Sequence, residues 1–350
     1  MAEGLPVTDS IRIAVASRGE LDSGVVVLDL GTGQRTGQLT GLPGALAMAL
    51  HPNGHVLYLA DGIGELLSIS LSDDGAPALL GRRPSGGQLP CALAIDPSGR
   101  FVVTAHYATA ELTVHPIGFD RALEPLAWTR EHDGSGPVIG RQDSAHLHHV
   151  NFDPVRGTAV VTDLGADRLY EYAFGPDGQP DLVDEVVAPS GSGPRHSVFH
   201  PDGSLLVSDE LSSTLSRYRR DPDTGRLGCT DTVDTREVAD GSDNFPSELV
   251  LAPNADVAYV ANRGRDTIAV IDLTGPRPSL VQEQPCGGAF PLHLAVVGEQ
   301  LLCANLESDT IVALPIDAGR LGEARHVASV PGPVWIRPLG TRHGDDGRPH

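Results

Sequence analysis

A short motif recurs seven times along the 350 residues of this chain and constrains its fold more than any other feature. Each copy is a β-type run that ends in a small residue followed by a polar one. The seven pairs are Ala16-Ser17, Ala60-Asp61, Ala105-His106, Thr162-Asp163, Ser208-Asp209, Ala261-Asn262 and Ala304-Asn305. Successive pairs are 44, 45, 57, 46, 53 and 43 residues apart. A repeat of about 45 residues that contains short strands is typical of a β-propeller blade.

The residues around each pair supply the other strands of a blade. Tight turns occur at 51–54, 96–99, 153–157, 200–203 and 252–255, and an alternating apolar run follows each pair. Alternation with a period of two indicates half-buried strands, and no long window has a helical period. We therefore predict an all-β, seven-bladed β-propeller with four antiparallel strands per blade. It forms a single domain over residues 1–350, closed by N- and C-terminal strands at 11–16 and 333–338, with flexible termini at 1–10 and 341–350.

The charge composition excludes several classes of partner. The chain has 46 Asp and Glu residues against 25 basic ones, which gives a net charge of −21, and all 25 basic residues are arginine. Nucleic acids and anionic membranes need clustered positive charge, so we expect neither as a partner. Without lysine, the chain has no side-chain amine for a Schiff base or a phosphate-loop ion pair. Any side-chain cation that contacts a ligand is therefore expected to be a guanidinium group.

The cysteines and the apolar runs indicate a cellular location. Cys91, Cys229, Cys286 and Cys303 are widely spaced and form no CxxC pair, as expected for thiols in a reducing compartment. No apolar run approaches the roughly 18 residues of a membrane span, and residues 1–10 lack the pattern of a signal peptide. We predict a cytoplasmic protein and leave its oligomeric state open.

The strand order of a blade sorts the polar residues between two faces. Loops that enter first strands and loops that leave second strands lie on one face, and the tight turns lie on the other. The first face is expected to carry Gln142, His146, His148, Arg195, His196, Glu248 and His293 from the entering loops, and His106, Asp163, Glu210, Arg263 and Asn305 from the leaving loops. Acids, histidines and arginines thus gather on one rim of the central channel.

Several segments resemble the lactonase family of seven-bladed propellers, which includes bacterial 6-phosphogluconolactonase and the fungal carboxymuconate lactonising enzyme. They are AHLHHVNFDP at 145–154, DLGADR at 163–168, GPRH at 193–196, DEL at 209–211, ANRG at 261–264 and ANLESD at 304–309. The resemblance spans nearly the whole chain, in order. It implies a site at the channel mouth whose catalytic residues are His148, Arg195, Glu210 and Arg263. His146 is the alternative to His148, because either histidine of the HxH pair matches the family pattern.

Six further polar residues of this rim are expected to bind the substrate. They are His146, Gln142, His106, His196, His293 and Asn305. The partner is therefore expected to be a small molecule, either anionic or a lactone.

The residue types at this site suit lactone chemistry. A histidine can transfer a proton during ring opening, and two guanidinium groups can bind an acid group and stabilise an oxyanion. Alternatively, the two arginines form salt bridges between blades with Glu210 and Asp209, and Glu210 acts as a base, orients His148 or only pairs with an arginine. A zinc site that contains His146, His148 and Asp163 is a further alternative, but we expect no metal and no cofactor.

Two departures from the family pattern bear on the substrate. Family members usually carry Asn-Tyr where this chain has His106-Tyr107, and an arginine after Phe-Pro where this chain has Leu292-His293. The rim is therefore expected to lack an additional arginine, which favours a less anionic and bulkier substrate than a phosphorylated sugar.

These observations predict hydrolysis of a lactone, either 6-phosphogluconolactone or another sugar or acid lactone. One alternative is a lactonising cycloisomerase or cyclase that acts on a carboxylated intermediate, for example in a biosynthetic pathway. Another is a non-catalytic propeller that binds its partner on the same rim.

Overall fold

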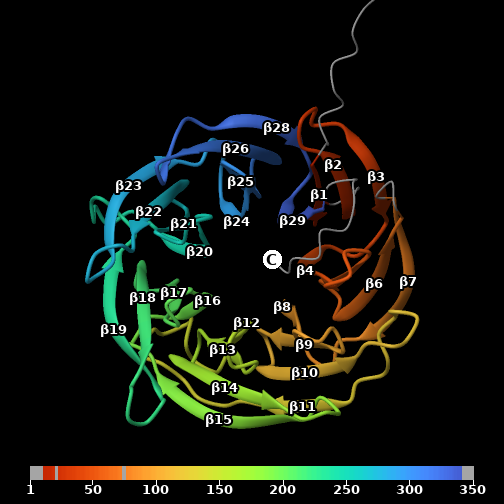
Figure 1. Cartoon of the computed structure of the whole chain (residues 1–350), viewed down its shortest axis with the longest axis horizontal. Helices are drawn as coiled ribbons and strands as arrows, with labels where there is room; N and C mark the ends of the chain where they lie inside the picture. The colour runs from red at the N-terminus through yellow and green to blue at the C-terminus, as the bar shows by residue number, and fades with distance from the viewer. Residues whose placement is uncertain (1–10, 20–22, 73–75, 341–350) are drawn as a thin grey trace, which may run out of the picture.

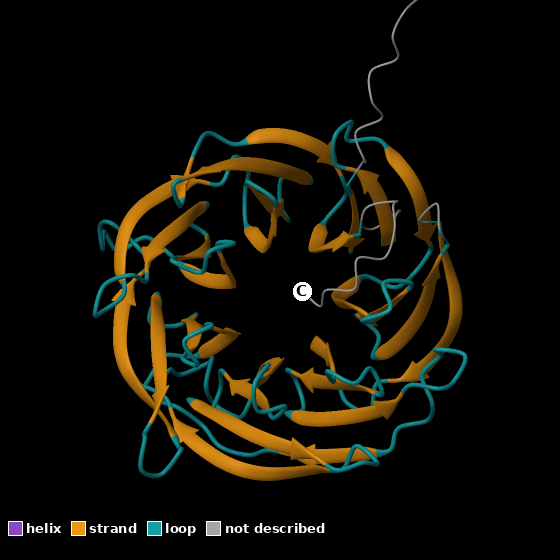
Figure 2. Cartoon of the chain, in the orientation of Figure 1, coloured by secondary structure: helices purple, strands orange, loops and turns teal. Residues whose placement is uncertain are grey.

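Seven β-sheets surround a central axis in the computed structural model, which describes residues 11–19, 23–72 and 76–340 (Figures 1 and 2). In the described residues every regular element is a strand. The predicted all-β, seven-bladed propeller is therefore confirmed, and the expectation for residues 1–10 and 341–350 lies outside the described residues. No helix in the described part of the chain is long and apolar enough to cross a membrane.

In each of the first four blades, the strands follow one another in chain order from the axis outward. Blade 1 contains β4 (Ala45–Leu50), β5 (Val56–Asp61), β6 (Glu65–Leu71) and β7 (Pro77–Pro84). Blade 2 contains β8 (Pro90–Ile95), β9 (Phe101–His106), β10 (Glu111–Pro116) and β11 (Trp128–Glu131). Blade 3 contains β12 (Leu147–Phe152), β13 (Ala159–Asp163), β14 (Arg168–Phe174) and β15 (Pro180–Val187). Blade 4 contains β16 (Pro194–Phe199), β17 (Leu205–Asp209), β18 (Thr214–Arg220) and β19 (Leu227–Asp234).

The other three blades follow the same order. Blade 5 contains β20 (Phe245–Leu251), β21 (Val257–Arg263), β22 (Thr267–Asp272) and β23 (Ser279–Pro285). Blade 6 contains β24 (Pro291–Val297), β25 (Gln300–Asn305), β26 (Thr310–Asp317) and β28 (Arg325–Ser329), with the short β27 (Arg320–Leu321) also paired to β26. Blade 7 contains β29 (Pro333–Leu339), β1 (Arg12–Ser17), β2 (Gly24–Asp29) and β3 (Arg35–Thr40).

The two ends of the described chain meet in blade 7 and close the ring, as the sequence predicted. The C-terminal strand β29 is the innermost strand and pairs antiparallel with the N-terminal β1, with Ile336 opposite Val15 (Figure 1). Ile336 is 1% exposed and packs with Ile13 and Val15 in one apolar cluster. This cluster also contains Leu302 of blade 6, so closure buries apolar side chains of neighbouring blades together.

The innermost strand of each blade contains a register shift near its start, on the face where the second strands end. We call this face the top face and the opposite one the bottom face. The residues skipped by the pairing with the second strand are Leu46, Cys91, His148, Arg195, Ser247, Leu292 and Val334, with Glu248 also skipped in blade 5. Such a β-bulge re-aims a side chain, so each blade presents one bulge residue at an equivalent place.

The tight turns form the bottom face and link neighbouring blades. His51 Nε2 donates a hydrogen bond to Gly99 O at 3.2 Å, and His200 Nε2 donates to Ala255 O at 3.0 Å. In both cases the acceptor belongs to the corresponding turn of the next blade. The turn histidines therefore stabilise the scaffold.

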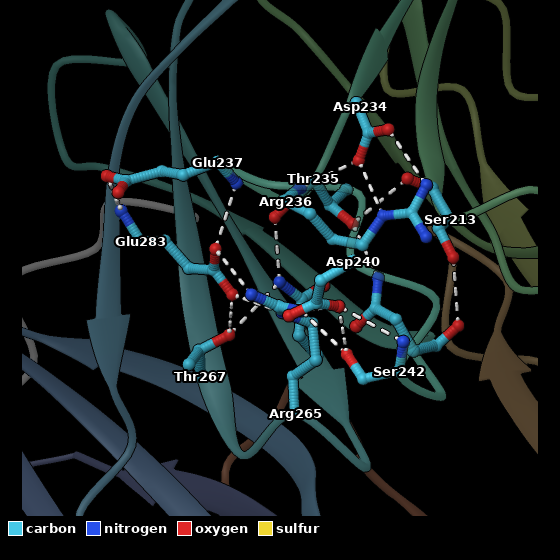
Figure 3. A network of polar contacts seen from close by, with 12 residues as sticks. Ser213, Asp234, Thr235, Arg236, Glu237, Asp240, Ser242, Arg265, Thr267 and Glu283 are labelled. Atoms are coloured by element: carbon cyan, nitrogen blue, oxygen red, sulfur yellow. Dashed lines mark hydrogen bonds and ion pairs between the residues drawn. The ribbon is translucent and has the colours of Figure 1, made fainter.

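The connection between blades 4 and 5 is held by a separate polar network (Figure 3). Arg265 Nε is 2.7 Å from Glu283 Oε1, and Arg265 Nη1 is 2.9 Å from Asp240 Oδ1. Glu237 N also donates to Glu283 Oε2 at 2.9 Å. These contacts tie residues 235–244 to blade 5 and position the segment that enters β20.

Replacing Ile336 with alanine tests the packing that accompanies ring closure. Because Ile336 is buried at the junction of blades 6 and 7, Ile336→Ala should lower the free energy of unfolding by about 2–5 kcal/mol. Urea denaturation measures this change. The matched control is Ile63→Ala, whose side chain is 68% exposed and whose effect should stay within about 0.5 kcal/mol. Equal effects of the two variants would contradict the assignment.

Candidate active site

Glu210 lies on the top face and contacts three guanidinium groups. Arg195 Nε is 2.9 Å from Glu210 Oε2, Arg263 Nη2 donates to the same oxygen, and Arg141 Nη2 donates to Oε1. Arg195 is the bulge residue of β16, Glu210 follows β17, and Arg263 ends β21. Neighbouring blades thus bring together three of the four predicted catalytic residues. Of the salt bridges considered as an alternative, those to Glu210 are present, whereas Asp209 accepts hydrogen bonds from Thr214 and Ser216.

The guanidinium groups determine the ionisation of Glu210. Burial by itself would raise the pKa of this carboxyl group, but the charges of Arg263 and Arg195 and the hydrogen bond from Arg141 lower the pKa to about 2. Burial, and then the charge of Arg263, lower the pKa of Arg195 to about 10. Arg195 Nη1 is buried without a hydrogen-bond partner among the described residues. Because three guanidinium groups share one carboxylate, the cluster has an excess of positive charge that suits an anionic ligand.

His148, the bulge residue of β12, lies beside this cluster. Its ring is edge-on to the rings of Tyr107 and His196, with both centroid distances at 5.8 Å. Burial lowers the pKa of His148 well below 6.5, and the positive charge of Arg195 lowers it further. Its Nδ1 atom is buried and has no hydrogen-bond partner in the described chain. The imidazole is therefore neutral near pH 7 and able to accept a proton.

His146 lies on the other side of Tyr107. The two rings stack at 4.4 Å, and His146 Nδ1 donates to Tyr107 O at 2.8 Å. Asp163 Oδ1, from the alternative zinc site, accepts hydrogen bonds from the backbone N–H groups of His146, Gly165 and Ala166. No three His, Cys, Asp or Glu side chains of the described residues are grouped to hold a metal ion. Of the two histidines in the HxH pair, His148 is the one beside Arg195.

The polar residue that ends each second strand is fully buried, and several of these residues bond to their own loop. These residues are Ser17, Asp61, His106, Asp163, Asp209, Asn262 and Asn305, each 0% exposed. His106 Nδ1 donates to Glu111 O at 3.0 Å, and Asn305 Nδ2 donates to Thr310 Oγ1 at 3.4 Å. The structure therefore does not bring His106 and Asn305, which were expected to bind substrate, to the Glu210 cluster. The residue that follows the buried polar residue in the sequence, Glu210 in blade 4 and Arg263 in blade 5, makes the contacts of the cluster.

Gln142 was also expected to bind substrate, but the structure shows it anchoring the connection that carries Arg141. Gln142 Nε2 donates to Asp167 Oδ1 at 2.7 Å. At the start of the same connection, His132 Nε2 accepts a hydrogen bond from the Tyr172 hydroxyl at 2.8 Å. Residues 132–146 thus hold Arg141 against a carboxylate of blade 4. The segment after Phe290 has no arginine, as predicted, but a third guanidinium reaches the cluster from the connection that carries Arg141.

The residues that follow the bulge residues in the innermost strands form a second layer, and Glu248 is one of them. Its Oε2 atom is 3.1 Å from His196 Nδ1 and 3.3 Å from His293 Nε2. Ile336 N donates to His293 Nδ1 at 3.4 Å, so the ring proton of neutral His293 is on Nε2 and faces the carboxylate. The ring of Trp335 packs on His293 with centroids 4.3 Å apart. Both histidines were expected to bind substrate. His196 lies beside His148, and His293 lies on the other side of Glu248.

The predicted site residues did not include Arg141, Tyr107, Glu248 and Cys91. Three of these had a signal in the repeat, because Cys91 is equivalent to His148, Tyr107 to Glu210, and Glu248 to His196. Burial raises the pKa of the Cys91 thiol to about 12, and Cys91 Sγ donates to His148 O at 3.4 Å. Arg141 had no such signal, because it lies in the longest connection between blades, which has no counterpart of equal length.

A neutral imidazole beside a partly unpaired guanidinium group can support attack of water on a carbonyl carbon. The imidazole accepts the proton of the water, and the guanidinium stabilises the negative charge that develops on the carbonyl oxygen. An ionised Glu210 holds the guanidinium groups in place without itself being protonated near neutral pH.

Comparison with known proteins identifies related chains. A family model described as lactonase, 7-bladed β-propeller, matches residues 19–338. The 6-phosphogluconolactonase of Bacillus subtilis is 29% identical over 302 residues, which cover 83% of this chain and 86% of that protein. The 6-phosphogluconolactonase of Formosa agariphila is 26% identical over 323 residues, with 85% and 90% coverage. The structure of a periplasmic gluconolactonase from Pseudomonas aeruginosa superimposes with a TM-score of 0.85 at 22% identity and covers 95% of this chain and 99% of its own, which shows the shared fold.

Asp209, beside Glu210, gives a test of the buried residues that end the second strands. Burial raises the pKa of Asp209 to about 7, although Ser216 and Thr214 donate hydrogen bonds to its Oδ2. The protonated carboxyl stabilises the fold at low pH, and this contribution is lost as pH rises from about 4, the pKa of an unfolded aspartate, towards the folded value. Asp209→Asn should therefore become progressively more stable relative to the parent over this range.

Urea denaturation at pH 5 and pH 8 measures the difference, and the comparison with the parent chain cancels the other titrating groups. Asparagine stands at the equivalent position in blades 5 and 6, as Asn262 and Asn305, so the substitution suits the fold. A stability difference that does not change with pH would show that Asp209 is ionised in the folded protein.

Proposed function

The chain belongs to the lactonase family of seven-bladed β-propellers, and on that basis we propose that it hydrolyses a lactone bound at the Glu210 cluster. The observation that carries this proposal is the pairing of neutral His148 with the positively charged cluster of Arg195 and Arg263. The relatives named 6-phosphogluconolactonase support hydrolysis over the ring-forming alternative.

The proposed reaction adds one water to the lactone and forms a hydroxy acid. His148 takes a proton from the attacking water as the new bond to the carbonyl carbon forms. The guanidinium group of Arg195 stabilises the resulting oxyanion. The bond from that carbon to the ring oxygen then breaks, and protonated His148 returns the proton to the leaving oxygen. Arg263 binds an acid group of the substrate, and Glu210 positions both guanidinium groups.

The first substrate to test is 6-phosphogluconolactone, the lactone in the names of two relatives. Three guanidinium groups at one carboxylate leave donors available for a phosphate. A cytoplasmic location remains part of this proposal and rests on the four widely spaced cysteines. The Pseudomonas aeruginosa protein with the same fold is named periplasmic, so the fold leaves the compartment open.

Substitution of His148 tests its proposed role as the general base. His148→Gln should lower kcat/KM for 6-phosphogluconolactone by about 100-fold or more, because the general base is lost. In the parent enzyme, kcat/KM should stay level as pH falls through 6.5 and decline only at lower pH, because the pKa of His148 is lowered. The assay follows acid release above the spontaneous rate.

The matched control for this variant is His55→Gln, which replaces an exposed histidine on the bottom face and should retain full activity. If parent and variant both bind ligand but neither exceeds the spontaneous rate of hydrolysis, the chain is a non-catalytic binding propeller.

Arg141 should contribute more to binding than to the chemical step. Its side chain is 36% exposed, against 7% for Arg195, so an approaching anion meets Arg141 first. Arg141→Met should raise KM for 6-phosphogluconolactone roughly 10-fold with a smaller change in kcat, because one charge-assisted hydrogen bond is lost. The KM for unphosphorylated gluconolactone should change much less.

Steady-state kinetics on both lactones measures the effect. Arg277→Met is the matched control, because the side chain of Arg277 is 85% exposed and lies outside the cluster. An equal loss of kcat on both lactones would instead place Arg141 in the chemical step.

A further inference from the structure

The bulge residues of the top face are polar in some blades and apolar in others. Among the equivalent bulge residues, blades 3 and 4 present His148 and Arg195, whereas blades 6, 7 and 1 present Leu292, Val334 and Leu46. The position after the second strand follows this division only in part, because blade 7 has Arg18 and blade 3 has Leu164. At the same position, blade 4 has Glu210 and blade 6 has Leu306.

The apolar region of blades 6, 7 and 1 contains accessible side chains as well as core. Phe290, Leu292 and Trp335 are partly buried and pack against one cluster that includes Leu306 and Val334. The cluster also contains Leu42 and Ala45, so it continues into blade 1. Partly exposed apolar side chains beside a polar site favour a ligand with an apolar part.

Phe290 joins this apolar region to the Glu210 cluster. Its ring lies 5.4 Å from Arg263 Cζ, and Leu306 N donates to Phe290 O at 3.0 Å. The backbone of Phe290 has a φ of 58°, a left-handed conformation that Gly193 and Gly332 adopt at the equivalent position of blades 4 and 7. Leu89 adopts the same conformation, with a φ of 55°, at the equivalent position of blade 2, so this backbone geometry belongs to the scaffold of the blades.

We propose that the lactone substrate is amphipathic: an apolar substituent lies over Phe290, Leu292 and Trp335 while its carbonyl and acid groups face Arg195 and Arg263. This inference rests on the proposed function, since it names the class of substrate for the same site. The ligand is a lactone with a carboxylate or phosphate on one side of the ring and an alkyl or aryl group on the other. The contact between Phe290 and Arg263 allows one molecule to reach both the apolar region and the Glu210 cluster.

The experiment compares two synthetic lactones that carry the same carboxylate. One has a hexyl chain and the other has a hydroxylated chain of equal length. The hexyl lactone should have the higher kcat/KM by about 10-fold or more, because burial of apolar surface is favourable. Equal kcat/KM values for the two would overturn the proposal.

Two variants test which residues cause the preference for the hexyl lactone. Leu292→Arg should lower kcat/KM for the hexyl lactone about 10-fold more than it lowers kcat/KM for the hydroxylated lactone. Its matched control is Val155→Arg, which places the same charge at a side chain that is 87% exposed in a bottom-face turn. Phe290→Gly keeps a backbone conformation that glycine adopts readily, and should reduce the preference without loss of the fold. Proportional losses on both lactones in both variants would contradict the assignment.

Binding of the hydrolysed products separates this proposal from the proposed function. Calorimetry with the parent protein should show tighter binding of the hexyl hydroxy acid, with a more negative heat-capacity change than for the hydroxylated acid. Tighter binding without turnover of either lactone would overturn the proposed hydrolysis alone. Equal affinities would overturn the amphipathic substrate, even if both lactones are hydrolysed.

Discussion

The antiparallel pairing of β29 with β1 closes the ring, and the arrangement of every blade around the axis depends on it. Each sheet covers the faces of its two neighbours, so an open ring would expose apolar surface at both ends. Closure also gives the innermost strands a common start on the top face. The repeated bulge then converts this common start into a set of equivalent side-chain positions.

The site is produced by variation at these equivalent positions within a constant backbone. The bulge places a cysteine, a histidine, an arginine, a serine or an aliphatic residue at corresponding places in different blades. Polar residues converge in blades 3 to 5, where Glu210 is shared by three guanidinium groups. A chain with a net charge of −21 thereby contains a local excess of positive charge. An anionic ligand responds to that local field, because low dielectric at a buried site strengthens short-range interactions.

The sequence predicted the fold well because the signals are local. Strand alternation and a repeat near 45 residues are visible without knowledge of contacts. It also predicted the meeting of Arg195, Glu210 and Arg263, because these residues stand at corresponding ends of neighbouring repeats. The side chains of His106 and Asn305 lie away from the Glu210 cluster, because adjacent residues of a strand point in different directions. Asp209 is buried in its loop, whereas Glu210 contacts the three arginines.

By itself the sequence determined seven blades, ring closure by the terminal strands, and the face on which the polar residues gather, since these follow from the period and direction of short strands. Only the tertiary structure decided that Arg141 reaches Glu210, because the two are 69 residues apart and no repeat relates them. It also decided that Phe290, Leu292 and Trp335 gather in one place, because their packing into one cluster depends on blades 6 and 7 meeting. Local sequence patterns encode strands. The neighbours of a side chain in a closed ring depend instead on how the whole chain folds to close that ring.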